Sequence, residues 1–273
     1  MIFRTAFHAA FRTAFHAVTT TTLSALLLTF GVKASENEPS ELLPATIIQQ
    51  QIMLNDILIS IHRLQLDLLD KDAREALEHA QQSLNISIHT LPENLHDPET
   101  NNLLESVLTL WPVISKHIIW LSTIPAIYEP PSATSLLQVL AKMDRQLLLL
   151  RQKTTKVPPG NRDKPRFLEQ ALLMQYMTRD YLSLLVSEQN AETADSGQMQ
   201  LKAQANRFDQ RMTAFNEEFS DHPHAMVPVH QALTTWSFIR SSFDKFPEQQ
   251  TPDLVVRYGS IIVSKLSSVH RMF

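Results

Sequence analysis

Apolar residues recur along this chain with the three- and four-residue spacing of amphipathic helices. In the first such segment the spacing is seven, three, four, three and four residues, and shorter stripes of the same kind run near residues 136–150 and 255–269. This spacing places the apolar side chains on one face of a helix, ready to pack against a neighbour. The first stripe consists of Ile47, Leu54, Ile57, Ile61, Leu64 and Leu68.

Helix start and stop signals divide the pattern into eight segments. Asp97-Pro98-Glu99 and Thr251-Pro252-Asp253 each have an N-cap residue, a proline at the first helical position and an acid in the first turn. The segments Pro130-Pro131 and Pro158-Pro159-Gly160 cannot continue a helix. We therefore predict helices over residues 42–70, 71–93, 98–124, 134–155, 164–188, 196–219, 224–246 and 251–272.

The chain repeats one phrase, which indicates a duplicated unit. Residues 51–58 read QIMLNDIL and residues 175–182 read QYMTRDYL, so that Gln, Met, Asp and Leu recur 124 positions later. Trp111 and Trp236 lie in later segments that match in the same way. Helices with short connections bury their apolar faces most simply as up-down bundles. The pattern predicts an all-α protein of two tandem antiparallel four-helix-bundle repeats, residues 35–157 and 158–273.

The first 34 residues are typical of a cleavable signal peptide. Arg4 and Arg12 precede an apolar run of about 10–15 residues, and Val32 and Ala34 supply small residues before a cleavage site after Ala34. The run is short for a transmembrane helix, which needs about 20 apolar residues, although an uncleaved anchor is an alternative. We expect an exported chain that meets a membrane only through this leader.

Charge and cysteine content narrow the function classes. Without the leader the chain has 21 basic and 28 acidic residues, a balance that argues against nucleic-acid binding. Cysteine is absent, so an exported chain would be held by its core alone. Only 4 glycines occur in 273 residues, which suits helices better than strands and tight hairpins.

The repeated phrase resembles the opening motif of PilJ-type domains. These are the periplasmic N-terminal domains of type IV pilus methyl-accepting chemotaxis transducers, related to nitrate/nitrite sensor domains, and their motif is close to QRMLSQRI. Trp111, Trp236 and a helix containing Phe208 and Met212 extend the similarity. The resemblance implies two tandem copies, a sensor-like function and a periplasmic location. It also leaves a homodimer open, since related sensors hold their anion between two subunits.

Both arginines of the family motif are missing from this chain. Ile52 and Ile57 replace them in the first copy, and Tyr176 and Tyr181 in the second. An arginine suits a planar anion because its guanidinium is a permanently charged fork of donors. A nitrate-like site is therefore not expected, and Arg179 is the nearest substitute.

Seven side chains around the two phrases are the candidate ligand-binding residues. The alternative is packing, because methionines fill gaps in bundle cores and aspartates commonly face solvent or cap a neighbouring helix. An aspartate at the same place in both copies is harder to explain by packing, since a buried carboxylate needs a partner. The candidates are Gln51, Met53, Asp56, Gln175, Met177, Arg179 and Asp180.

Catalytic and metal chemistry have little support in the sequence. There is no G-x-S-x-G, no H-E-x-x-H and no phosphate-binding glycine loop, so no catalytic residue, metal ligand or cofactor is predicted. Two weaker alternatives are a metal held by His222, His224 and His230, and a haem held by Met53 and His117. The two tryptophans are expected to anchor cores through large rings, with each indole N–H bonded to a partner, and the alternative is that they line a ligand pocket.

The expected function is non-enzymatic recognition. We expect an exported, sensor-like helical domain that binds a small ligand or a protein partner, and that lacks its own signalling output because the chain stops at Phe273. The alternative is a structural adaptor that docks on a type IV pilus or an envelope sensor.

Overall fold

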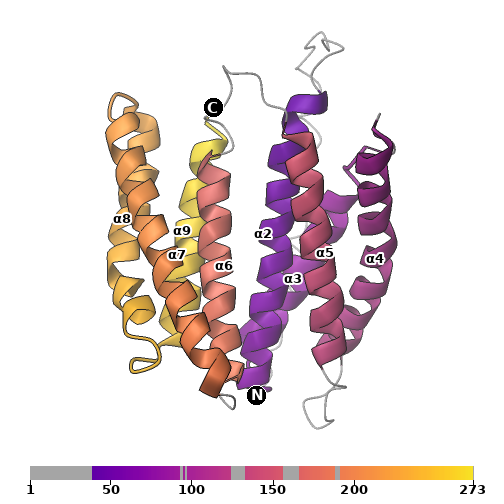
Figure 1. Ribbon diagram of the computed structural model, residues 1–273, viewed down its shortest axis with the longest axis horizontal. Coiled ribbons are helices and arrows are strands. Elements are labelled where there is room, and N and C mark those ends of the chain that lie inside the picture. Colours follow the sequence, from indigo (N-terminus) through magenta and orange to yellow (C-terminus); the bar gives the residue numbers. More distant parts are fainter. Residues whose placement is uncertain are drawn as a thin grey trace, which may run out of the picture. The chain divides into compact units, whose positions relative to one another are not determined.

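The computed structural model describes residues 39–92, 95, 97–123, 133–155, 166–187 and 191–272, and these contain α-helices and no strand (Figure 1). This confirms the predicted all-α class. The leader over residues 1–34 lies outside the described residues, and no helix among them is both long and apolar enough to cross a membrane. The helices are α2 Pro39–Leu66, α3 Lys71–Ile88, α4 Pro98–Thr123, α5 Ala133–Thr154, α6 Arg166–Ser187, α7 Ala191–Glu218, α8 Pro223–Asp244 and α9 Pro252–His270.

The two predicted proline starts differ in how they are capped. At α4 the carboxylate of Asp97 accepts hydrogen bonds from the backbone N–H and the hydroxyl of Thr100, as an N-cap residue should. At α9 the hydroxyl of Thr251 makes no capping bond and lies 2.8 Å from the Ser242 hydroxyl. The N–H of Thr251 instead donates to the Tyr181 hydroxyl over 2.8 Å. Thr251 is thus the N-cap residue of α9, as predicted, but its side chain makes no capping bond because contacts with α6 and α8 use its polar groups.

The buried apolar side chains of residues 40–272 form two clusters. The N-terminal core consists of residues from α2, α3, α4 and α5 and includes Leu54, Leu84, Trp111 and Leu147. The C-terminal core consists of residues from α6, α7, α8 and α9, joined by Ile48, Ile52 and Ile59 of α2. Helix α2 therefore contributes to both cores, and it links the two groups of helices.

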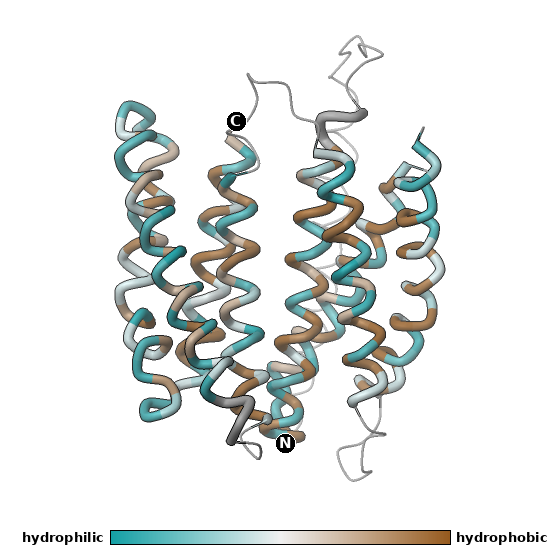
Figure 2. The backbone as a smooth tube through the Cα atoms, in the orientation of Figure 1, coloured by the Kyte–Doolittle hydropathy of each residue, from teal (hydrophilic) through white to brown (hydrophobic). Residues whose placement is uncertain are grey.

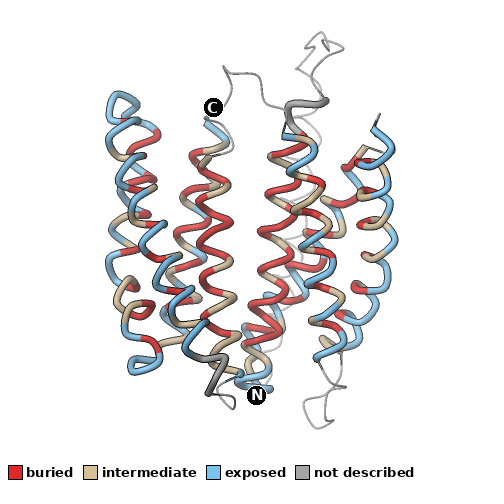
Figure 3. The backbone as a smooth tube through the Cα atoms, in the orientation of Figure 1, coloured by how far each residue is buried: buried red, intermediate tan, exposed pale blue. Residues whose placement is uncertain are grey.

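Helices α2 and α6 are buried around much of their circumference. Figure 2 shows apolar residues recurring along both helices, and Figure 3 shows buried positions along most of their length. A helix that is buried on several sides must also bury some polar side chains. In α2 these include Gln50, Gln51, Asn55 and His62, and in α6 they include Gln170 and Gln175.

The hydrogen bonds between helices define how neighbouring helices run. In α3 and α4, Gln81 donates to Ser115 while Asn85 accepts from Trp111, so the residue numbers run in opposite directions. Helices α7 and α8 show the same antiparallel pattern through Asn206–Arg240 and Asp209–Trp236. Helices α2 and α6 instead run parallel to each other. Gln51 bonds Tyr176 and Asn55 bonds Arg179, so the residue numbers increase together along the two helices.

A helix interior is an unfavourable place for glycine, and Gly259 in α9 has a packing reason. A Cβ atom at this position would lie 2.7 Å from the hydroxyl oxygen of Thr178 in α6. The glycine therefore lets α6 and α9 approach more closely than an alanine would. The buried Thr178 hydroxyl has no hydrogen-bond partner, so its removal would leave no other group unsatisfied.

We predict that Gly259→Ala destabilises the protein, even though alanine is favoured over glycine in helices by about 1 kcal/mol. Overpacking a close helix contact costs about 1–3 kcal/mol, and the new methyl group meets Thr178. The free energy of unfolding is measured by urea denaturation. The matched control is Thr178→Ala, in which Gly259→Ala should become neutral or stabilising. A stabilised single Gly259→Ala variant would contradict the close approach.

Candidate functional site

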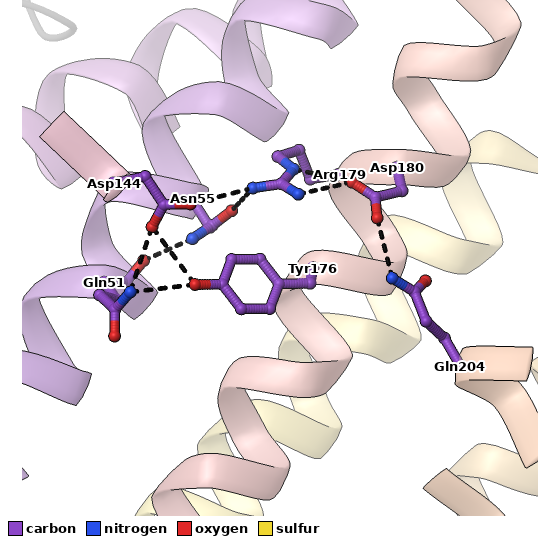
Figure 4. Close-up of polar contacts among 7 residues, drawn as sticks. All are labelled: Gln51, Asn55, Asp144, Tyr176, Arg179, Asp180 and Gln204. Carbon is purple, nitrogen blue, oxygen red and sulfur yellow. Dashed lines mark hydrogen bonds and ion pairs between the residues drawn. The ribbon is translucent and has the colours of Figure 1, made fainter. Parts of the chain in front are cut away.

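The repeated phrases meet each other where α2 lies beside α6. The amide of Gln51 donates to the Tyr176 hydroxyl over 3.0 Å, and Arg179 Nη1 donates to Asn55 Oδ1 over 3.0 Å (Figure 4). Asn55 and Arg179 are 124 residues apart, which is the spacing of the repeat, and Gln51 and Tyr176 are 125 apart. We call the polar side chains at this contact the seam: Gln51, Asn55, Asp56, Asp144, Gln175, Tyr176, Arg179, Asp180 and Gln204.

Arg179 is the charged centre of the seam. Its Nε and Nη2 atoms lie 2.9 and 2.7 Å from one carboxylate oxygen of Asp180, and its Nη1 lies 3.4 Å from Asp144 (Figure 4). The guanidinium carbon also lies 4.7 Å from the centre of the Tyr176 ring, within cation–π range. Burial acts to lower the pKa of Arg179, but Asp180 and Asp144 outweigh it and raise that pKa.

Asp144 brings α5 into the seam. One of its carboxylate oxygens accepts from Gln51 and from the Tyr176 hydroxyl, each over 3.3 Å. Burial raises the pKa of Asp144, although Arg179, Gln51 and Tyr176 act to lower it. Burial also raises the pKa of Tyr176, and the nearby Asp144 carboxylate adds to this effect. Tyr176 therefore remains a neutral hydroxyl that can donate.

Asp56 occupies the second buried carboxyl position. Gln175 Nε2 donates to its Oδ1 over 2.6 Å, so the two phrases are also joined through a glutamine of one and an aspartate of the other. Burial raises the pKa of Asp56 to about 7, and the Gln175 bond only partly opposes this. Its equivalent in the second phrase, Asp180, is paired with Arg179 and also accepts from Gln204 of α7 over 3.0 Å.

The structure joins five of the seven candidate ligand residues into the seam, namely Gln51, Asp56, Gln175, Arg179 and Asp180. The two methionines lie in different cores. Met177 is fully buried in the C-terminal core, and Met53 packs against the N-terminal core. Their equivalent positions therefore serve packing within each group of helices.

Four seam residues were not among the predicted candidates: Asn55, Asp144, Tyr176 and Gln204. Asp144 follows Met143 in an apolar stripe, and one position off such a stripe is ordinarily solvated. Tyr176 occupies the position at which the PilJ-type motif has an arginine. This substitution was the feature of the sequence that could have identified it as a seam residue. Asn55 and Gln204 carried no signal, because ordinary helix surfaces contain many amides.

The predicted roles of the tryptophans are confirmed. Trp111 and Trp236 are both buried in their cores, and each indole N–H donates to a side chain of the preceding helix, Asn85 or Asp209. These acceptors are themselves 124 residues apart. The same contact therefore occurs at equivalent positions of the two helix groups.

The histidine alternatives are not brought together as sites. His117 is exposed on α4 and its Nδ1 contacts the carbonyl of Val113, whereas Met53 packs against the N-terminal core. His230 contacts Asn216, and among the described residues no three His, Cys, Asp or Glu side chains group as metal ligands. Buried His62, near the seam, has a lowered pKa because burial disfavours its charged form.

The chain matches no protein-family model, no curated protein and no solved structure. The resemblance to PilJ-type domains thus depends on the repeated phrases and the later tryptophans, and it stays a prediction.

We predict that Asp56 makes stability fall as pH rises. The folded protein binds the Asp56 proton more tightly than the unfolded chain, so this contribution is fully present below pH about 4 and is lost as pH rises through about 7. The loss amounts to at most about 4 kcal/mol. Asp56→Asn keeps an oxygen acceptor for Gln175 and is neutral at every pH, so the Asp56 part of the fall should be absent from this variant.

The measurement is urea denaturation of both proteins between pH 4 and pH 8. His62 has the opposite sign and Asp144 the same sign, so the difference between wild type and Asp56→Asn isolates the Asp56 contribution. The exposed Asp221 provides a control, since Asp221→Asn should parallel the wild type. Parallel curves for wild type and Asp56→Asn would contradict the raised pKa.

Proposed function

We propose that the chain is a non-enzymatic helical adaptor of the sensor-domain type, which acts by binding a protein partner. One contrast carries this proposal. The charged centre of the seam is already paired within the protein, with Arg179 occupied by Asp180, Asn55 and Asp144. An open groove of about 420 Å³ lies instead between α3 and α4, lined largely by apolar side chains. Such an apolar recess at the surface favours contact with another molecule.

We infer further that α2–α5 and α6–α9 are two copies of one four-helix unit, within residues 35–157 and 158–273. Three observations support duplication: the separate cores, the recurring tryptophan contact, and the equivalent residues that meet across α2 and α6. When a unit is duplicated, a surface of one copy can remain adapted to stability while the equivalent surface of the other copy becomes a binding surface.

The partner class that we propose follows from the sequence resemblance. A leader of the secretory type and the PilJ-like phrases favour a periplasmic protein, and they point to a type IV pilus component or an envelope sensor as partner. The seam supports an adaptor because it couples the two helix groups through the bonds of Arg179 in α6 to Asn55 in α2 and Asp144 in α5.

We predict that a photo-crosslinking residue at Ile119 captures a discrete partner in the cells that make the protein. Ile119 lines the groove and is 51% exposed. The control position is Met199 of α7, a similarly exposed apolar residue outside the groove. The measurement is the pattern of crosslinked bands after irradiation. Adducts that are absent at both positions, or identical at both, would contradict an adaptor that uses this groove.

A small ligand in the seam is the second candidate, and one observation favours it. The side-chain oxygen Oε1 of Gln51 is buried without a hydrogen-bond partner, beside Tyr176 and Asp144. An unpaired buried acceptor costs free energy, which a ligand with an N–H or O–H group would recover.

The ligand candidate is tested by thermal-shift screening of small anions and of metabolites with amide or hydroxyl groups. A ligand at one hundred times its Kd should stabilise the wild type by about 2.7 kcal/mol. Gln51→Leu removes the acceptor, so this variant should lose the stabilisation, whereas Gln200→Leu on the exposed part of α7 should keep it. Equal shifts in wild type and Gln51→Leu would exclude this site.

A further inference from the structure

The α3–α4 surface and the equivalent α7–α8 surface carry different side chains. The α3–α4 surface carries the groove, with Asn85, Trp111, Ser115 and Ile119 among its lining residues. Counting 124 residues on from α3 and 125 on from α4 gives the corresponding α7–α8 residues, which are Asp209, Trp236, Arg240 and Asp244. The tryptophan and its acceptor partner are retained, but a serine is replaced by an arginine and an isoleucine by an aspartate.

A charged bridge crosses the α7–α8 surface. Arg240 donates to Asp209 over 2.6 Å and to Asn206 over 2.9 Å, and it also pairs with Asp244 of its own helix. Its long side chain therefore crosses from α8 to α7 beside Trp236. At the equivalent place in α4, the short Ser115 side chain accepts one bond from Gln81. The open groove is thus a property of the α3–α4 sequence and is not imposed by the helix arrangement.

The groove combines an apolar surface with a basic rim. Ile88, Leu108, Trp111 and Ile119 provide apolar walls, whereas Lys116 and His89 provide donors. Lys116 is exposed and forms no ion pair within the described part of the chain, and no acidic side chain lines the groove. A partner that fits this surface should present apolar side chains together with a carboxylate.

Pro112 shapes the same surface. Helix α4 continues through this proline, but a proline nitrogen carries no hydrogen and cannot donate to the carbonyl of Leu108 one turn earlier. Leu108 and Pro112 both line the groove, so the proline removes a backbone bond beside it. In α8 the equivalent residue is Ser237, whose backbone N–H can donate.

The dimensions favour a helical segment. The lining residues of α4 run from Leu108 to Ile119, and eleven steps along a helix cover about 17 Å, or three turns. An amphipathic helix of similar length places apolar residues at i, i+3 or i+4, and i+7 along such a groove. A second copy of this chain is a poorer occupant, because a two-fold pairing would bring Lys116 and His89 of both copies together.

We propose that the groove between α3 and α4 binds an amphipathic α-helix of a partner protein, which presents acidic side chains to Lys116. This inference rests on the proposed adaptor function and names the chemistry of the partner. The apolar face of that helix would cover Ile119 and the edge of Trp111, while its carboxylates would pair with the basic rim.

The test is selection from a phage-displayed library of 18-residue amphipathic helices against the immobilised protein. We expect the enriched peptides to carry Asp or Glu beside an apolar stripe, and fluorescence anisotropy of synthetic copies measures their Kd. The double variant Asn85→Asp/Ser115→Arg rebuilds the α7–α8 bridge in the groove and should weaken binding at least tenfold. Thr109→Arg adds the same charge at an exposed position outside the groove and should leave the Kd unchanged.

Lys116→Glu tests the charge rule at an exposed position, where folding is not at risk. Selection against this variant should enrich Lys and Arg in place of Asp and Glu. The proposal is overturned if no peptide is enriched, if acidic residues are not preferred, or if the double variant binds as tightly as the wild type. A concentration-dependent dimer that only the double variant abolishes would also overturn it, by identifying a second copy as the occupant. Crosslinks at Ile119 without acidic peptides would leave the adaptor function standing and remove this inference alone.

Discussion

The contacts of Arg179 in α6 with Asn55 in α2 and Asp144 in α5 constrain how the two helix groups meet. Arg179, Asp144 and Asp180 are largely withdrawn from water, which carries a desolvation cost that is offset only when the geometry supplies every partner. Asn55 from α2, Asp144 from α5 and Gln204 from α7 complete the set. A shift of α6 along α2 by one turn would separate Arg179 from Asn55 and leave buried donors without acceptors. The apolar contacts of Ile48, Ile52 and Ile59 add attraction, but they specify the register less strictly.

The same constraint explains the different fates of the two repeated phrases. An aspartate at the same place in each phrase is buried near the other helix, yet the surroundings differ. Asp180 forms an ion pair with the neighbouring Arg179 guanidinium, whereas Asp56 meets an amide and has a raised pKa. Burial raises the pKa of Asp56 because no cation lies beside it to replace the water that its carboxylate loses, and the Gln175 amide compensates only in part.

The sequence predicted helix positions well and long-range partners poorly. Apolar spacing and the prolines indicated all the described helices, because amphipathic periodicity reports a helix before its neighbours are known. The repeat selected Gln51, Asp56, Gln175, Arg179 and Asp180, since matching polar residues in buried phrases need partners. Asp144 was missed because its partners lie on α2 and α6, and the spacing within α5 carries no information about them. The α9 start and its N-cap residue Thr251 were predicted correctly, but the bonds of that residue to Tyr181 and Ser242 were not, since both partners lie on other helices.

By itself the sequence determined that this protein is helical, approximately where its helices begin and end, and which phrases resemble each other. These features depend on local spacing, on proline and capping chemistry, and on comparison of the chain with itself. Only the tertiary structure decided that the two phrases lie side by side on parallel helices and that Arg179 pairs with two carboxylates. It also decided that Arg240 bridges the surface beside Trp236, whereas the surface beside Trp111 forms an open groove. Those outcomes depend on which side chains from distant segments come within bonding distance, and packing of the helices alone determines that.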